Sequence, residues 1–177
     1  PLIRPEGDVG IATKGLNGYA DLVTFPCYQW NHVVIVPPEH PLVHAPVLTL
    51  PLLANHPLVT YESGFTGRPH IDEALARQSI EPDIVLTAMD ADVIKTYVAD
   101  GLGVGIIASV AYEPARDTML KALEAKHLFA SNTTRLAMRR GAYLRNFDHA
   151  FIELFAPQLN RDSIEKALRE HADDYAI

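Results

Sequence analysis

The chain of 177 residues contains a single cysteine, Cys27, and this scarcity limits its covalent and metal chemistry. One cysteine cannot form an internal disulfide, and a zinc site built on cysteine needs several thiolates. A lone thiol is also typical of a reducing compartment. We therefore expect no internal disulfide, no metal site and a cytoplasmic location.

Basic residues and long apolar runs are also scarce. Lys and Arg number 15 against 22 Asp and Glu, which gives a net charge of -7. A nucleic-acid surface needs clustered Lys and Arg to release counterions, and the sequence offers only the pair Arg139–Arg140. No apolar run reaches the roughly 18 to 20 residues of a membrane span, and no signal peptide is recognisable. We expect a soluble protein that has no membrane partner and does not itself bind DNA.

Strand-like and helix-like runs alternate along the chain, which predicts an α/β fold. The strand-like runs are rich in Val, Ile and Leu without polar alternation, as in strands buried on both faces. They cover residues 9–13, 32–36, 58–61, 84–88 and 104–108.

Helical spacing of apolar residues marks the segments between and after these runs. Segments 123–129 and 133–139 are expected to be extended and to connect two lobes. The expected helices cover residues 69–78, with Pro69 at the first position; 90–100, capped by Asp90; 144–155; and a final helix capped by Asn160.

Three patterns that resemble catalytic, cofactor or metal motifs have simpler interpretations. Residues 101–105 (GLGVG) follow a helix and precede a strand, the reverse of a dinucleotide fingerprint, so a tight turn is favoured. A proline between His40 and His44 argues against metal ligands on one helical face. A hydrolase with Cys27 or Ser63 as nucleophile stays an alternative, although no base is identifiable. We expect no enzyme activity and no cofactor.

Residues 62–69 (ESGFTGRP) predict an anion site, because they follow an expected strand and open an expected helix. Backbone N–H groups released by Gly64 and Gly67, the Thr66 hydroxyl and the helix dipole can converge on an anion there. Thr13 places a second hydroxyl at the end of another strand, where α/β sheets bind ligands. Capping and turn chemistry alone would explain the same residues, so that alternative stays open.

Five stretches of the sequence resemble one family, the LysR-type transcriptional regulators of the CysB-like branch, which control the cysteine regulon and sulfonate utilisation. The similarity runs from about residue 7 to residue 162. The stretches are PCY with WN at 26–31, PLVTY at 57–61, GFTGR at 64–68, DADVIKTYV at 90–98 and GLGVG at 101–105.

The resemblance implies two Rossmann-like lobes of the periplasmic-binding-protein type, joined by two crossover segments, with an effector in the cleft. Residues 1–27 would form part of lobe I, residues 28–131 lobe II, and residues 132–177 the return crossover and C-terminal helices of lobe I. The first lobe would be incomplete in this chain, because the family's first strand, loop and helix have no counterpart in the sequence.

The resemblance also implies a function, the binding of an inducer by the effector domain of a sulfur-metabolism regulator. The family senses sulfate and O- or N-acetylserine, and Thr13 and Thr66 fall on its anion-contacting positions. Gly64 and Gly67 would let the backbone approach the anion, and Arg68 would add charge. The alternative is a solute-binding protein for a small anion.

Two partners follow from the resemblance and from the apolar pattern. Promoter DNA would be bound only through the family's N-terminal helix-turn-helix, which is absent from this sequence. Phe147, Phe151 and Phe155 form one stripe without an upstream partner, so we expect the chain to form a homo-oligomer or to keep a nicked upstream fragment bound. Glu62 departs from the relatives' pattern, and its carboxylate would disfavour an anion if it points inward.

Overall fold

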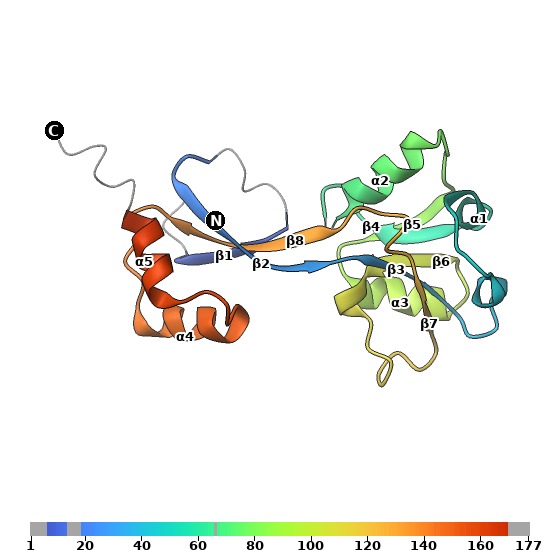
Figure 1. The fold of residues 1–177 in the computed structure, drawn as a ribbon. Coiled ribbons are helices and arrows are strands. Elements are labelled where there is room, and N and C mark those ends of the chain that lie inside the picture. Colours follow the sequence, from blue (N-terminus) through green and yellow to red (C-terminus); the bar gives the residue numbers. More distant parts are fainter. Residues whose placement is uncertain (1–6, 14–18, 66, 170–177) are drawn as a thin grey trace. The chain divides into compact units, whose positions relative to one another are not determined.

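A computed structural model describes residues 7–13, 19–65 and 67–169 (Figure 1). The chain divides into two compact units. Unit 1 consists of Pro1–Gln29 and Thr133–Ile177, and unit 2 of Trp30–Asn132. Unit 2 is therefore one continuous segment, whereas unit 1 combines the two ends of the chain. The assignment of the predicted lobes to residues 1–27, 28–131 and 132–177 stays a prediction.

Unit 2 is built on a five-stranded mixed sheet with the order β5-β4-β6-β3-β7. The central strand pairs are parallel, β4 with β5 and β4 with β6, while β3 runs antiparallel to both β6 and β7. The strands are β3 (His32–Val36), β4 (Leu58–Tyr61), β5 (Ile84–Ala88), β6 (Val104–Ala108) and β7 (Lys121–Glu124).

Helices cover both faces of this sheet, as an α/β fold requires (Figure 1). Ile71 of α2 and Leu53 of α1 pack in one apolar cluster with β3 and β6, and Ile94 and Val98 of α3 pack in a second. The helices of unit 2 are α1 (Leu50–Ala54), α2 (Arg68–Arg77) and α3 (Ala91–Ala99), with short 3-10 turns η1 (Pro41–His44) and η2 (Ser109–Ala111).

The sequence predicted four of these strands at the observed bounds, but it was wrong about the burial of β5. Every residue of β4 and β6 is buried. In contrast, β5 lies at the sheet edge, and its residues alternate, with Val85 42% exposed. An edge strand has one neighbour and is less completely covered, so its outward side chains remain open to solvent.

The predicted extended segment 123–129 is also wrong beyond Glu124, where β7 ends. The N–H of Leu128 donates to the carbonyl oxygen of Ala125 over 2.9 Å, so the chain turns. Ala125 and Phe129 on either side of this turn are both buried. Both side chains pack in the same apolar cluster of unit 2.

Unit 1 contains a three-stranded sheet with the order β1-β8-β2, in which β1 pairs antiparallel with β8. One apolar cluster joins this sheet to two helices through Leu136, Met138, Ile152 and Ile164. The elements are β1 (Val9–Ala12), β2 (Leu22–Trp30), β8 (Asn132–Arg139), α4 (Asn146–Phe155) and α5 (Arg161–Arg169). No helix among the described residues is long and apolar enough to cross a membrane.

The two predicted helix caps are confirmed. The Asp90 carboxylate accepts a hydrogen bond from the N–H of Asp92 over 2.6 Å at the beginning of α3. The Asn160 side chain accepts from the N–H of Ser163 over 2.8 Å at the beginning of α5. Each cap satisfies an N–H group that the first helical turn cannot bond internally.

Candidate functional site

The predicted site residues lie on both units of the chain. Thr13 follows β1 of unit 1 and is half-buried. Gly64, Gly67 and Arg68 belong to unit 2, where they form the connection from β4 into α2. Thr66 lies outside the described residues. The use of these residues in ligand binding therefore stays a prediction, and only the part on unit 2 forms one describable loop.

The loop between β4 and α2 bends at two glycines. Gly64 has φ 86° and Gly67 has φ 72°, a left-handed conformation that costs little only for glycine. The N–H of Phe65 donates to the carbonyl oxygen of Glu62 over 3.1 Å, and the N–H of Arg68 donates to that of Phe65 over 2.8 Å. The loop thus makes two successive turns and delivers the chain into α2.

The first turn of α2 offers few backbone donors of its own. The N–H of Arg68 is used by Phe65, Pro69 has no N–H, and the N–H of His70 donates to the carbonyl oxygen of Gly67 over 2.9 Å. Among the residues that the structure describes, no side chain caps the helix at Gly67. An anion at this helix end therefore needs donors from side chains as well as the helix dipole.

Arg68 is buried, and its guanidinium already contacts two groups of unit 2. Its Nε donates to a carboxylate oxygen of Asp72 over 2.6 Å, and its Nη1 donates to the carbonyl oxygen of Tyr61 over 2.7 Å. The bond to Tyr61 ties the beginning of α2 to the end of β4, and the bond to Asp72 lies within α2. Arg68 thus brings a positive charge near the loop, and its guanidinium is hydrogen-bonded to residues of unit 2 itself.

One buried polar group beside Gly67, the side chain of Asn132, was not predicted from the sequence. A Cβ atom at Gly67 would lie 2.7 Å from the Asn132 Oδ1, 2.8 Å from its Nδ2 and 2.9 Å from Cε1 of His32. Asn132 and His32 are both buried. No local sequence signal identifies this cluster, because Asn132 lies far along the chain and only the fold brings it to Gly67.

His32 lies among aromatic rings. Its ring centroid is 5.4 Å from that of Trp30 and 5.5 Å from that of Phe129, each in an edge-to-face arrangement. The surroundings of Gly67 therefore combine a polar amide with aromatic side chains and little solvent. In such a low-dielectric setting, a hydrogen bond to a bound group is stronger than in water.

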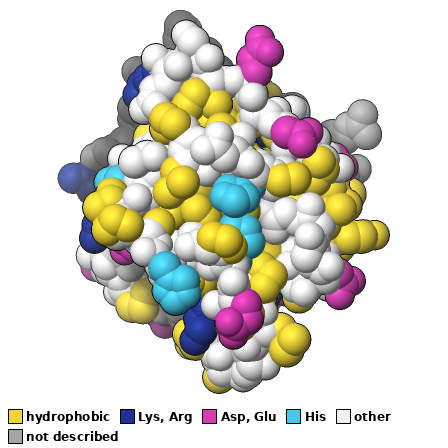
Figure 2. All heavy atoms as spheres, turned by 90° about the vertical axis from the view of Figure 1, so that its right-hand side faces the viewer, with side chains coloured by type: hydrophobic (Ala, Val, Ile, Leu, Met, Phe, Trp, Pro, Cys, Tyr) yellow, Lys and Arg dark blue, Asp and Glu magenta, His cyan; other side chains and the backbone are white. Residues whose placement is uncertain are grey.

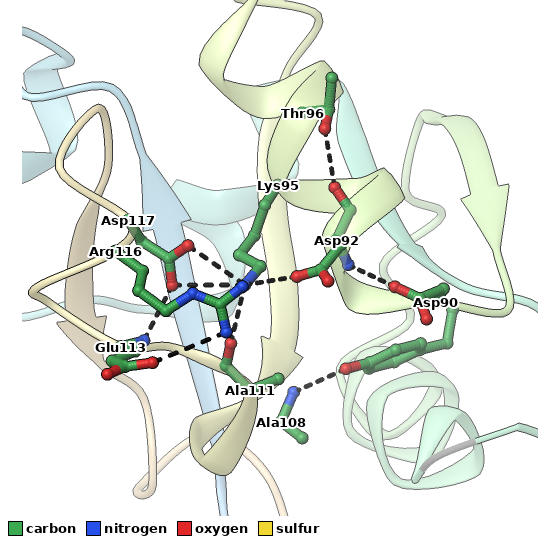
Figure 3. A network of polar contacts seen from close by, with 10 residues as sticks. Asp90, Asp92, Lys95, Thr96, Ala108, Ala111, Glu113, Arg116 and Asp117 are labelled. Carbon is green, nitrogen blue, oxygen red and sulfur yellow. Dashed lines mark hydrogen bonds and ion pairs between the residues drawn. The ribbon is translucent and has the colours of Figure 1, made fainter.

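A network of polar contacts fixes the segment after β6 to α3 (Figure 3). The Lys95 ammonium donates to the carbonyl oxygen of Ala111 over 3.0 Å and lies 2.7 Å from a carboxylate oxygen of Asp92 and 3.1 Å from one of Asp117. Burial opposes the charge of Lys95, but the hydrogen bonds to Asp92 and Asp117 outweigh it and raise the pKa of Lys95. Asp92 and Lys95 in the stretch 90–98 thus help to hold α3 against the segment that follows β6.

The alternative of a cysteine nucleophile finds little support in the surroundings of Cys27. Its Sγ donates to the carbonyl oxygen of Phe25 over 3.4 Å, and burial raises the pKa of the Cys27 thiol. A nucleophilic cysteine requires a lowered pKa, because the thiolate is the reactive form. Ser63 is exposed in the loop after β4. The environment of Cys27 is that of a packed residue in a strand.

Histidine side chains gather among hydrophobic ones on one face of unit 2 (Figure 2). His40 and His56 lie with their ring centroids 4.8 Å apart, and His40 Nδ1 accepts from the N–H of Leu42 over 3.2 Å. Burial and the neighbouring His56 lower the pKa of His40. Within residues 7–13, 19–65 and 67–169, no group of three or more side chains is placed to hold a metal ion.

Comparison with known protein families gives one match that covers most of the chain. The model of the LysR substrate binding domain matches residues 2–160. The chain is 52% identical over 169 residues to the HTH-type transcriptional regulator SsuR of Burkholderia cenocepacia, a match that covers 96% of this chain and 55% of that protein. It is 48% identical over 176 residues to CysB of the same organism, covering 99% and 56%.

Solved structures of transcriptional regulators also match this chain. The cofactor-binding domain of the Cbl transcriptional regulator matches with a TM-score of 0.88 and 43% identity, covering 96% of this chain and 74% of that one. The effector-binding domain of QuiR in complex with shikimate matches with a TM-score of 0.75 at 20% identity, which indicates a shared fold alone. The chain spans about half the length of the curated relatives it matches.

Proposed function

This chain belongs to the family of LysR substrate-binding domains, and on that premise we propose that it senses the inducer of a regulator of sulfur and cysteine metabolism. The predicted family and the predicted α/β fold of the periplasmic-binding-protein type are confirmed. The relatives named above are transcriptional regulators, which agrees with the expectation that the chain is not an enzyme. The observation that carries the proposal is the high identity to SsuR and CysB over nearly the whole chain.

The proposed effector is a small anion, sulfate or an O- or N-acetylserine. We assign its binding to Thr13 and Thr66, with Gly64, Gly67 and Arg68 around the helix end. The left-handed conformation of both glycines supports this assignment. It bends the loop immediately before α2, and the absence of side chains at these two positions lets a ligand approach the backbone. The engagement of Arg68 by Tyr61 and Asp72 favours a supporting role for its charge over a direct bond to the anion.

The proposal extends to the whole protein that contains this chain. Promoter DNA is bound by a helix-turn-helix outside this sequence, and the protein works in the cytoplasm as a homo-oligomer. Of the predicted stripe, Phe147 is 60% exposed and Phe151 is also exposed, which supplies apolar surface for self-association, whereas Phe155 is half-buried against the apolar cluster of unit 1. Effector binding shifts a population between two conformations, in proportion to its differential affinity for them.

The experiment that tests the effector class is calorimetric titration of the full-length protein with sulfate and with N-acetylserine. Thr66→Ala removes one hydroxyl bond to a charged ligand and should weaken binding about tenfold to a hundredfold. The matched control is Thr118→Ala, because Thr118 is an exposed threonine of the same unit. Equal affinity in the parent and in Thr66→Ala for every anion tested would contradict the proposed site.

A further inference from the structure

We propose that the side-chain amide of Asn132 contacts the effector at the beginning of α2 and determines its specificity. This inference rests on the proposed function and deepens it. It assigns to the site a ligand class, small acids that carry a hydrogen-bond donor such as an N–H beside their oxyanion. Inorganic sulfate, which only accepts hydrogen bonds, would fit the amide less completely.

The burial of Asn132 is the first observation that supports this role. Its side chain is 2% exposed, and among the described residues neither Oδ1 nor Nδ2 has a hydrogen-bond partner. An amide removed from water without a partner destabilises a protein, so such groups are rare in folded structures. Thr60, equally buried in the same unit, donates to the carbonyl oxygen of Ile106 over 3.1 Å.

The position of the amide is the second observation. Both of its polar atoms would lie within 2.8 Å of a Cβ atom at Gly67, the residue that immediately precedes α2. The amide is therefore directed at the beginning of a ten-residue helix. The N-terminus of a helix carries a partial positive charge that attracts an anion.

Two backbone positions at the beginning of α2 have no free N–H, which gives the amide a chemical task. The N–H of Arg68 is bonded within the loop, and Pro69 supplies no N–H. The Asn132 Nδ2 adds the donor that an oxyanion needs there. Its Oδ1 remains as an acceptor, and only a ligand with its own donor satisfies both atoms at once.

The test is a calorimetric titration of the full-length protein with N-acetyl-L-serine and with sodium sulfate. Asn132→Leu removes the donor and the acceptor at similar size, while Asn132→Ser keeps a smaller polar group in case the leucine variant fails to fold. Both variants should weaken N-acetyl-L-serine binding about tenfold or more, and sulfate binding by a smaller factor. Thr60→Val is the control and should leave both affinities unchanged.

A thermal melt without ligand separates a binding role from a structural one. If the amide serves the ligand, Asn132→Leu should melt at or above the parent temperature, whereas Thr60→Val should melt lower because it removes the buried hydrogen bond to the Ile106 carbonyl. Unchanged affinity of the Asn132 variants for both probes would overturn this inference and leave the proposed function standing. A parent protein that binds neither probe would refute the proposed function, and the role of Asn132 with it.

Discussion

The Nζ of Lys95 and the Oδ1 of Asp117 lie 3.1 Å apart, and both side chains are largely buried, with 14% and 11% exposed. The pair joins α3 to the segment that follows η2, and the same ammonium also bonds to Asp92 and to the carbonyl of Ala111. Asp117 additionally accepts from the N–H of Glu113 over 2.8 Å. One lysine therefore contacts the largely buried Asp117 carboxylate, the Ala111 carbonyl and the exposed Asp92 carboxylate.

Lys95→Met should lower the free energy of unfolding by about 3 kcal/mol, because it leaves the Asp117 carboxylate buried without its cation. Urea denaturation of the parent and the variant measures the difference. Lys126→Met is the control, since the pair of Lys126 with Glu124 is exposed at 3.8 Å and should be worth under about 0.5 kcal/mol. Equal effects of the two substitutions would contradict the structural role of Lys95.

The contribution of this network to stability should decrease at acidic pH and again at alkaline pH. The hydrogen bond from Lys95 lowers the pKa of Asp92 below its ordinary value of 3.8, so this stabilisation is present above that pH and is lost as pH falls through the folded-state pKa. The pKa of Lys95 is raised above 10.5, so its stabilisation is present below that pH and is lost at higher pH.

The difference in unfolding free energy between the parent and Lys95→Met, followed from pH 3 to pH 11, measures this dependence. It should stay constant over roughly pH 5 to 9 and shrink outside that window. A difference that grows as the pH falls below 4 would show that the charges do not stabilise each other.

Gly67→Ala should destabilise unit 2 more than Gly64→Ala does. Both positions have positive φ, which costs a residue with a Cβ about 1 to 2 kcal/mol. A Cβ at Gly67 would also collide with Asn132 and His32, whereas no described residue beyond its chain neighbours lies within 4 Å of a Cβ at Gly64. Overpacking typically adds about 1 to 3 kcal/mol, so we expect a larger loss at Gly67 in chemical denaturation. The reverse order would show that the cluster around Gly67 is loose.

Cys27 should react slowly with iodoacetamide in the folded protein at neutral pH. Burial raises its pKa, so little thiolate is present, and the residue is half-buried in β2. We expect the labelling rate to be about tenfold or more below that of the protein unfolded in urea. A folded-state rate equal to or above the unfolded rate would reopen the possibility of a reactive thiol.

The sequence predicted β3, β4 and β6 at their observed bounds because buried strands leave uninterrupted apolar runs. The bounds of β5 were also predicted, although this edge strand is only partly buried. The sequence did not predict β2, since Pro26 stands inside that strand and proline usually argues against one. The structure explains the exception, because β2 is an edge strand of the sheet in unit 1.

The candidate site was predictable only where its chemistry is local. Gly64 and Gly67 predict a bend before a helix, and both residues have positive φ in the structure. The bond from Arg68 to the Tyr61 carbonyl and the approach of Asn132 to Gly67 depend on tertiary packing. Residues that meet across distant parts of the chain leave no periodic pattern, so sequence reasoning could not find them.

The first and last residues of unit 2 lie close together in space. His32, near its beginning, and Asn132, at its end, both place side-chain atoms against Gly67. Unit 2 therefore resembles a domain inserted into the sequence of unit 1. The chain passes from unit 1 to unit 2 at the end of β2 and returns at the beginning of β8, which is the neighbour of β2 in the sheet. Once unit 2 has folded, it brings the two halves of unit 1 together, so their association no longer bears the entropy of closing a long loop. We expect folding to be hierarchical, with unit 2 forming first and unit 1 unable to assemble when unit 2 is unfolded.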